Sequence, residues 1–387
     1  MDLRNLPDGL DAEGRISKRR ALIEEELDIS LSALPISKEQ IGDADERNCE
    51  HMFGAVPVPV GLAGPLRIHF SSGESQDVYL PLATTEAALV ASVNRGCKAV
   101  TAAGGVHSSS DYIGITRSVA FETNDGKVSS AGIRTLESEW RRIGEATSDH
   151  LKILSYEIDV KDNLLFLTIA ADTDEAMGMN MVTIAAQAIG GFLSGELNMP
   201  MLTVAGNVDS DKKPSVRTKT HGRGYRVRAE VVLPGEVIRD VLKSTPDALL
   251  KTAQAKLEAG SEIAGALGKN LHVANIVAAL YLATGQDAAH VVEGSLADTI
   301  LSKGEDGVRI RVEIPALLVG VRGGGTNLPA QKQCLGVLLK AGTSLKPSAQ
   351  LAEIIAGAIL AGEISLLAAQ STNTLAQAHR ALARGGR

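Results

Sequence analysis

Two adjacent lysines lie in a polar, turn-rich loop and could stabilise negative charge on a carbonyl oxygen. The loop reads GNVDSDKKP over residues 206–214, so Asp211 precedes Lys212 and Lys213, and a proline follows them. A fixed ammonium group stabilises an oxyanion or binds a carboxylate. A solvated surface loop has the same composition, but polar loops between domains are also where binding sites gather. The loop is therefore a candidate site, and a simple linker is the equal alternative.

Two carboxylates stand at predicted helix ends, where each has both a structural and a catalytic interpretation. Glu86 precedes an alanine-rich stretch, so an N-cap at Thr85 would place it in the first helical turn. Asp287 follows the apolar run 273–283 and could cap the next helical segment. The helix dipole alone explains acidic residues at such positions. If the two carboxylates lay beside Lys212, their pKa values would be shifted, because a like charge raises the pKa of a carboxyl group and an ammonium lowers it.

Two glycine-containing segments open predicted helices. The first comprises Glu175, Ala176, Met177, Gly178, Met179 and Asn180. Free N–H groups at a helix start can receive a phosphate or a dinucleotide, and the alternative is a set of methionines that fill a core. The second segment, GGGTN at 323–327, leads into a helix with Pro329 in its first turn, which suits proline. The chain has no GxGxxG, P-loop, HExxH or GxSxG motif, so an ordinary Rossmann fingerprint is absent.

Strands and helices alternate between residues 118 and 204, which predicts a small α+β unit inserted into a larger one. The predicted order is strand, helix, strand, strand, helix, at 118–121, 136–147, 153–158, 163–170 and 180–197. Alternating side chains then predict a half-buried strand over 225–233. Helices are predicted for most of the remainder, at 245–268, 270–283, 327–341, 348–369 and 374–384.

The first 50 residues predict a polar arm with one charged helix at 16–27. A capping-box pattern, Ser37 to Gln40, predicts a short helix after Pro35. Residues 54–66 read GAVPVPVGLAGPL, which predicts a rigid extended segment because proline neither continues a helix nor donates to a central strand. A strand over 77–82 and a long helix over 85–102 complete the order of elements.

Composition excludes several classes of protein. The 387 residues include 39 Lys and Arg and 46 Asp and Glu, which gives a net charge of −7 and argues against nucleic-acid binding. Three cysteines without CxxC spacing indicate neither a metal centre nor a disulfide framework. No apolar leader and no run of about 18 uninterrupted apolar residues is present, so we expect a cytoplasmic protein that does not bind membranes.

Taken in order, these motifs resemble the 3-hydroxy-3-methylglutaryl-CoA reductase family. The resemblance runs from about residue 47 to 380, and it most resembles the family's first class in its soluble form. The blocks that carry it are PVPVGLAGPL (57–66), LATTEAALVASVNRGCKA (82–99), EAMGMNM (175–181), GNVDSDKKPS (206–215), GRGYRVRAEVV (222–232), ANIVAALYLATGQDAA (274–289), GGGTNLPAQKQCLGVL (323–338) and AGEISLLAAQ (361–370).

The resemblance implies an oxidoreductase that reduces hydroxymethylglutaryl-CoA to mevalonate and coenzyme A with two hydrides from a nicotinamide. The implied fold is α+β: a mainly helical large domain (51–117 and 205–387) binds the CoA substrate, and an inserted ferredoxin-like domain (118–204) binds NAD(P). Residues 1–50 are the N-terminal arm. It also implies a homodimer or tetramer with active sites at the subunit contact.

By the same resemblance, four residues are catalytic. Lys212 matches the lysine that stabilises the oxyanion, Glu86 the proton donor, Asp287 the carboxylate that tunes both, and His379 the histidine that protonates departing CoA. The remaining matches are Arg117, Asp211, Lys213 and Asn275 at substrate-binding positions, and Glu175 to Asn180 at cofactor-binding positions.

Departures from the family pattern leave the acyl substrate and the cofactor open. Ala205 replaces a serine, and Arg322 replaces a small apolar residue. A reductase for a related branched acyl-CoA, or an acyl-CoA binding or lyase-type protein without hydride transfer, are the alternatives. NADPH is predicted from the class and from the Arg141–Arg142 pair, whereas Glu139 stands where relatives carry a phosphate-binding arginine and would favour NADH.

Overall fold

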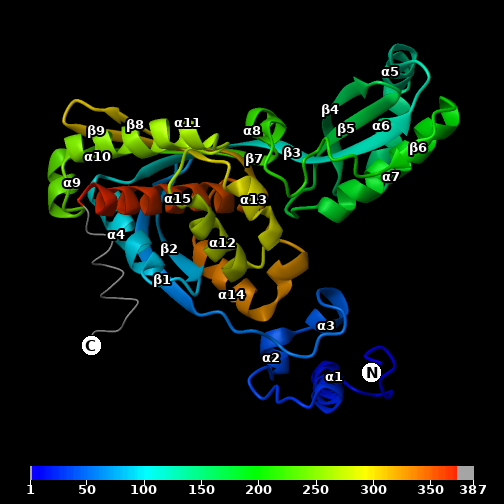
Figure 1. The fold of residues 1–387 in the computed structure, drawn as a ribbon, viewed down its shortest axis with the longest axis horizontal. Coiled ribbons are helices and arrows are strands. Elements are labelled where there is room, and N and C mark those ends of the chain that lie inside the picture. The colour runs from blue at the N-terminus through cyan, green and yellow to red at the C-terminus, as the bar shows by residue number, and fades with distance from the viewer. Residues whose placement is uncertain (1, 373–387) are drawn as a thin grey trace.

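The computed structural model describes residues 2–372, and one long strand joins its two main units (Figure 1). This strand, β3 (Val106–Glu122), pairs along its first half with β7 (Gly224–Pro234), with Tyr112 opposite Tyr225. Its second half, from Ile115 onward, pairs antiparallel with β5 (Leu164–Asp172). The register with β7 shifts near Gly114, whose φ of +96° suits glycine. The strand therefore passes from one sheet into the other at this point.

The larger unit has a mixed sheet in the order β2–β1–β3–β7–β9–β8. Its remaining strands are β1 (Val60–His69), β2 (Ser75–Ala83), β8 (Asp298–Lys303) and β9 (Gly307–Leu317). Its helices are α4 (Leu89–Ala102), α8 (Val216–His221), α9 (Gly235–Asp240), α10 (Pro246–Ala253), α11 (Ser261–Ala264), α12 (Val273–Thr284), α13 (Val291–Gly294), α14 (Pro329–Leu338) and α15 (Pro347–Ser371).

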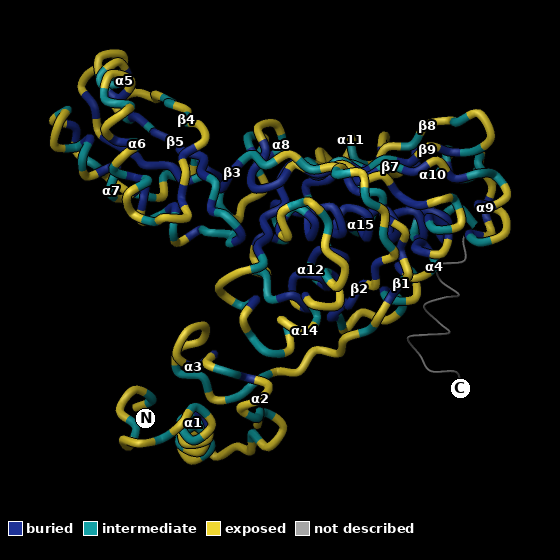
Figure 2. Tube along the Cα trace, turned by 180° about the vertical axis from the view of Figure 1, so that it is seen from behind, coloured by how far each residue is buried: buried dark blue, intermediate teal, exposed yellow. Residues whose placement is uncertain are grey.

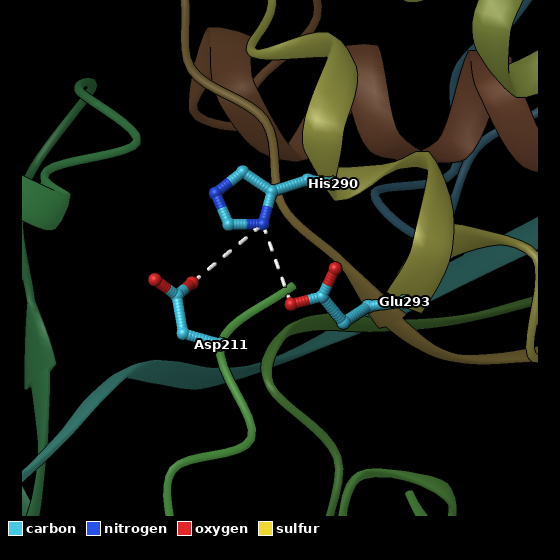
Figure 3. Close-up of side chains that lie close together, drawn as sticks. All are labelled: Asp211, His290 and Glu293. Carbon is cyan, nitrogen blue, oxygen red and sulfur yellow. Dashed lines mark hydrogen bonds and ion pairs between the residues drawn. The ribbon is translucent and has the colours of Figure 1, made fainter. Parts of the chain in front are cut away.

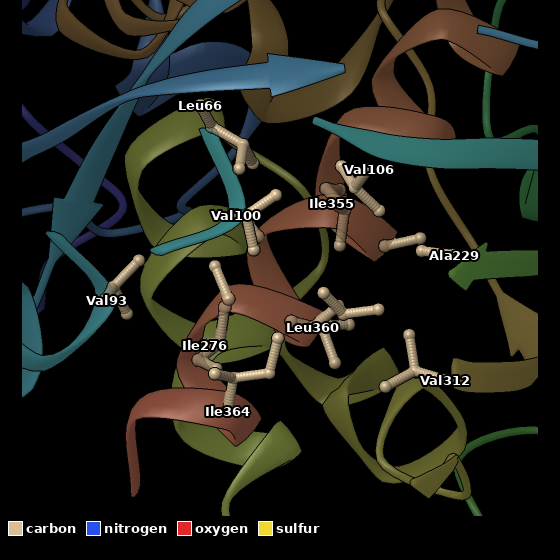
Figure 4. Packing of buried hydrophobic residues seen from close by; sticks show 14 of the residues in the cluster. Leu66, Val93, Val100, Val106, Ala229, Ile276, Val312, Ile355, Leu360 and Ile364 are labelled. Carbon is tan, nitrogen blue, oxygen red and sulfur yellow. The ribbon is translucent and has the colours of Figure 1, made fainter. Parts of the chain in front are cut away.

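Helix α15 forms the centre of the large unit (Figures 1 and 2). By length and composition it could cross a membrane, but its most apolar window is 94% buried inside the protein, as expected for a core helix. Ile355, Leu360 and Ile364 pack among side chains from the sheet and from α4 and α12 (Figure 4). A Cβ on Gly96 of α4 would lie 1.8 Å from the Ala361 carbonyl oxygen, so the two helices meet backbone to backbone there.

The smaller unit packs three helices on an antiparallel sheet. Its strands are β4 (Lys152–Lys161), β5, the second half of β3 and β6 (Met201–Thr203), and its helices are α5 (Gly126–Thr135), α6 (Glu137–Glu145) and α7 (Met179–Glu196). Trp140 is fully buried in this core and donates to the Ile133 carbonyl at 2.9 Å. The predicted elements of this unit are present, and α5 and β6 are additions that the sequence did not indicate.

The N-terminal arm carries α1 (Ala12–Leu27), α2 (Lys38–Ile41) and α3 (Ala44–Arg47) and projects from the large unit (Figure 1). Ile16, Ile41 and Ala44 form a small core of their own. The predicted capping box is confirmed, with the Ser37 N–H donating to Gln40 Oε1 at 3.3 Å.

Several predicted elements differ in the structure. The segment predicted to be rigid and extended enters a sheet, since residues 60–66 belong to β1, and Pro65 is tolerated because the pairing of β1 with β2 shifts between Ala63 and Leu66. Strands β8 and β9 were not predicted. The helix predicted over 245–268 is interrupted by a π-helical stretch at Gln254–Gly260. The helix predicted at 374–384 lies outside the described residues.

Candidate active site

A cavity of about 840 Å³ opens where the two units meet. It is bounded by the first turn of α7, the 206–214 loop, the turn after α12 and the glycine-rich loop before α14. Its lining residues are Asn48, Arg117, Thr147, Ser148, Ala176, Met177, Gly178, Met179, Asn180, Met181, Ile184, Asp211, Lys212, Gly285, Gln286, Asp287, Gly320, Arg322, Gly323, Gly324, Gly325 and Thr326.

Lys212 and Asp287 form an ion pair in this cavity, with Nζ 3.0 Å from Oδ2. The Lys212 backbone has a φ of 57°, and its N–H donates to Glu293 Oε1 at 2.6 Å, which fixes the tight turn. Asp287 also caps the following 3-10 turn by accepting from the Ala289 N–H at 3.0 Å. Burial opposes its ionisation, but the bonds from Lys212 and Ala289 keep the pKa of Asp287 below its usual value. The cap and the charge partner predicted for Asp287 therefore coexist.

A buried arginine supports the loop from below. Arg223 is fully buried, and its Nη1 lies 2.9 Å from both Asp211 Oδ1 and Glu293 Oε1. Burial opposes ionisation of Asp211 and Glu293, yet neighbouring positive charge, that of Arg223 included, holds the pKa of both below the usual value. Asp211, His290 and Glu293 could also be considered as metal ligands (Figure 3). The guanidinium already supplies positive charge between the two carboxylates, so we infer no metal site.

Arg117 reaches the same region from β3. Its Nη1 lies 3.1 Å from Asp209 Oδ2 and 3.5 Å from Asp211 Oδ2, and its Nε donates to Thr183 Oγ1 at 3.0 Å. It therefore ties the loop to α7 while one side faces the cavity.

The first turn of α7 forms the opposite wall. Gly178 is its N-cap with a φ of +80°, and a Cβ there would lie 2.3 Å from Thr173 Cβ. The N–H groups of Gly178, Met179 and Asn180 lie at the start of α7, and free N–H groups at a helix start commonly bind phosphate groups. The Glu175 side chain does not line the cavity, because it is buried and accepts from the Ser348 N–H at 2.9 Å.

Replacing Gly178 by alanine should disturb this wall. We expect a loss of about 1–3 kcal/mol of unfolding free energy, because the new Cβ collides with Thr173 at a positive φ. Urea unfolding measures this loss. The matched control is Gly191→Ala on the same helix, where a Cβ meets nothing within 4 Å and stability should stay equal or rise by up to about 1 kcal/mol. Equal behaviour of the two variants would contradict this account.

Some predicted site residues lie away from the cavity. Glu86 is exposed and lies in the loop before α4, because the helix starts at Leu89 with Ala88 as its cap. Its N–H donates to Thr84 Oγ1 at 3.0 Å, so the predicted first-turn position is wrong. Asn275 lies in the first turn of α12, and neither it nor the exposed Lys213 lines the cavity. His379 lies outside the described residues.

The arginines predicted to bind a cofactor phosphate behave differently as well. Arg141 Nε bonds Glu137 at 2.7 Å, Nη1 donates to the Ile153 carbonyl at 3.0 Å, and the guanidinium stacks on Trp140 and Tyr156. It is committed to the small unit's own packing. Among the described residues, neither member of the Arg141–Arg142 pair lines the cavity.

Three residues around the ion pair were not predicted from the sequence: Arg223, His290 and Glu293. The spacing of Asp287, His290 and Glu293, three residues apart each time, was the available signal, since it aligns side chains on one face of a helical turn. Arg223 had no such signal because its partners are distant in sequence.

Known proteins are similar to this chain over nearly its whole length. A family model described as hydroxymethylglutaryl-coenzyme A reductase matches residues 15–384. Proteins named 3-hydroxy-3-methylglutaryl-coenzyme A reductase from Aeropyrum pernix and Haloferax volcanii are 41% and 39% identical, over 95% and 97% of this chain and 89% and 94% of theirs. A class II 3-hydroxy-3-methylglutaryl-CoA reductase structure from Streptococcus pneumoniae bound to NADPH has the same fold, with a TM-score of 0.70 over 92% of this chain and 96% of that one, at 19% identity.

Proposed function

The chain belongs to the hydroxymethylglutaryl-coenzyme A reductase family, and we propose that its reaction takes place at the Lys212–Asp287 pair. The activity is the reduction of hydroxymethylglutaryl-CoA to mevalonate with a nicotinamide as hydride donor. The single observation that carries the site proposal is the 3.0 Å ion pair, which faces a large cavity bounded by both units. The sequence also left open a protein that only binds acyl-CoA, or a lyase. Neither would need this ion pair opposite a helix start that can bind a dinucleotide.

Lys212 supplies the positive charge that the chemistry needs. Addition of a hydride to a thioester carbonyl places negative charge on its oxygen, and an ammonium aimed at that oxygen stabilises it. The Lys212 side chain is 43% exposed, so Nζ can turn from Asp287 toward a bound carbonyl. Asp287 then lowers the cost of keeping the ammonium charged in the cavity.

Each reduced nicotinamide would supply one hydride, so one turnover would use two cofactor molecules in succession, and the first turn of α7 would hold each of them. A Cβ on Gly178 would collide with the buried Thr173, so glycine lets this turn pack closely, and the Gly178, Met179 and Asn180 N–H groups at the helix start suit the cofactor diphosphate. Arg117 and Asp211 border the substrate side, and we assign Lys213, Asn275 and the CoA-protonating His379 to substrate handling from the family resemblance.

We propose that two copies of the chain complete each active site. Glu86, the proton donor by resemblance, does not line the cavity of its own chain. An apolar strip on the segment 56–62 and β2 is exposed, with Val56 at 80% and Leu62 at 58%, together with Val58, Val60 and Tyr79. Apolar surface of this kind is typical of an interface between subunits. A homodimer would cover the strip, and a tetramer would pair two such dimers. A cytoplasmic location stays a prediction.

We predict a preference for NADPH. Arg322 would be the cation that binds its 2′-phosphate, the group that NADH lacks. Arg322 lines the cavity, is 70% exposed, and lies 3.8 Å from its carboxylate partner Asp174, whereas Arg117 and Lys212 are held by closer pairs. Initial rates with hydroxymethylglutaryl-CoA should give a kcat/KM for NADPH at least tenfold that for NADH, about 1.4 kcal/mol.

Two variants sharpen this test. Arg322→Gln should lower kcat/KM for NADPH about tenfold and more than for NADH. Glu139→Arg should leave the preference unchanged, because Glu139 does not line the cavity. A tenfold preference of the wild type for NADH, or a response to Glu139 rather than Arg322, would refute the assignment.

A further inference from the structure

His290 is a fully buried imidazole that the proposed chemistry does not use. It ends the 3-10 turn that Asp287 caps, and it faces the cavity's ion pair from behind. The ring's Nδ1 lies 3.4 Å from Glu293 Oε1 and 4.0 Å from Asp211 Oδ1 (Figure 3). Its Nε2 lies 3.6 Å from Asp287 Oδ2 and has no hydrogen-bond partner among the described residues.

Both ring nitrogens therefore face carboxylate oxygens. A neutral imidazole donates from one nitrogen and accepts at the other, whereas the imidazolium donates from both. The ring edge thus presents one nitrogen to Asp287 and the other to Glu293.

The charged groups around His290 include more carboxylates than permanent cations. The groups that face His290 are Asp211, Asp287 and Glu293, with the cations Lys212 and Arg223 bound to them. Arg117 also approaches Asp211, but it is matched by Asp209, and the buried Tyr281 hydroxyl is neutral. Three carboxylates thus face two permanent cations in a site where an unpaired charge is costly.

Asp287 Oδ2 is shared between His290 and Lys212, at 3.6 and 3.0 Å. Lys212 must leave this oxygen, at least in part, when its ammonium turns to a substrate oxyanion. The imidazole of His290, fixed in the core 3.6 Å from this oxygen, then limits the movement of the carboxylate.

We propose that His290 is a positioning residue that holds Asp287 in register with Lys212 during turnover. This inference rests on the proposed function of the Lys212–Asp287 pair. His290 itself touches neither substrate nor cofactor, because it is buried behind Asp287 and is not among the residues that line the cavity.

The test compares His290→Ala and His290→Gln with the wild type by steady-state kinetics between pH 6 and pH 9. His290→Ala should lower kcat about 10–100-fold while KM for hydroxymethylglutaryl-CoA changes less than about threefold, the size of effect known for groups that orient a reacting side chain. His290→Gln, which can still donate to Asp287, should recover most of kcat.

Val277→Ala, a buried truncation in α12 beside this turn, controls for lost stability and should leave kcat near normal. A His290→Ala kcat within twofold of the wild type overturns the proposal, as does an equal kcat loss in Val277→Ala at equal stability. Failure of the underlying site assignment is distinct, since it would show as a Lys212 variant that retains activity whatever happens at His290.

Discussion

Lys212→Ala is expected to lower kcat by about 10²–10³-fold or more while hydroxymethylglutaryl-CoA still binds measurably. The ammonium acts on charge that develops as the hydride arrives, so its loss affects the transition state far more than the bound substrate. The loop should keep its shape in the variant, because Glu293 holds the backbone N–H of residue 212 rather than its side chain. Lys212→Met, which keeps the aliphatic stem, should lose as much activity as the alanine variant.

Two measurements separate this from a structural effect. Equilibrium binding of the substrate should change much less than kcat, and Lys303→Ala, at an exposed lysine at the end of β8, should be indistinguishable from the wild type. Removal of Lys212 also removes the bond that, against burial, keeps the pKa of Asp287 low, so Asp287 should protonate at a higher pH in the variant. Near-normal kcat in Lys212→Ala would end the assignment of this pair as the reaction site.

The elements of the site were largely predictable, because they depend on local patterns. The period-2 pattern of β7 and the apolar run of α12 predict those elements close to their observed bounds. Strands β8 and β9 were missed although residues 309–314 alternate basic or acidic with apolar side chains, since helical signals on both sides outweighed a short run. The start of α4 was predicted four residues early because Thr85 suited an N-cap, whereas the backbone at Ala88 takes a φ of +73° and begins the helix after it.

Local sequence patterns could not show which residues lie close together in the folded chain. Lys212 and Asp287 are 75 positions apart in the chain, and β3 crossing between the units brings the loop and the turn together. Arg223 is ordinary in sequence, yet the topology makes it the buried partner of two carboxylates from separate segments. Glu86 shows the opposite case. The family resemblance gives it a role beside Lys212, but within one chain it does not line the cavity.

Mixing two inactive variants should restore activity if the site is shared between subunits. Glu86→Gln and Lys212→Ala homodimers should each lose about 10²-fold or more in kcat. In a mixed dimer, one site combines the intact Glu86 of one chain with the intact Lys212 of the other, and its second site carries both changes. Half of the sites in a mixed dimer are then complete.

Co-expression of the two variants at equal levels should therefore recover about one quarter of the wild-type activity, because about half of the dimers are mixed. Separately purified variants should show no recovery until their subunits exchange, and size-exclusion chromatography with light scattering reports the dimer itself. A chain carrying both changes, co-expressed with either single variant, should recover nothing, since no combination then supplies an intact Glu86 and an intact Lys212 to one site. Absence of recovery from well-mixed dimers would place Glu86 outside the shared site, whereas recovery requires that the exposed loop before α4 of one protomer faces the Lys212 loop of its partner.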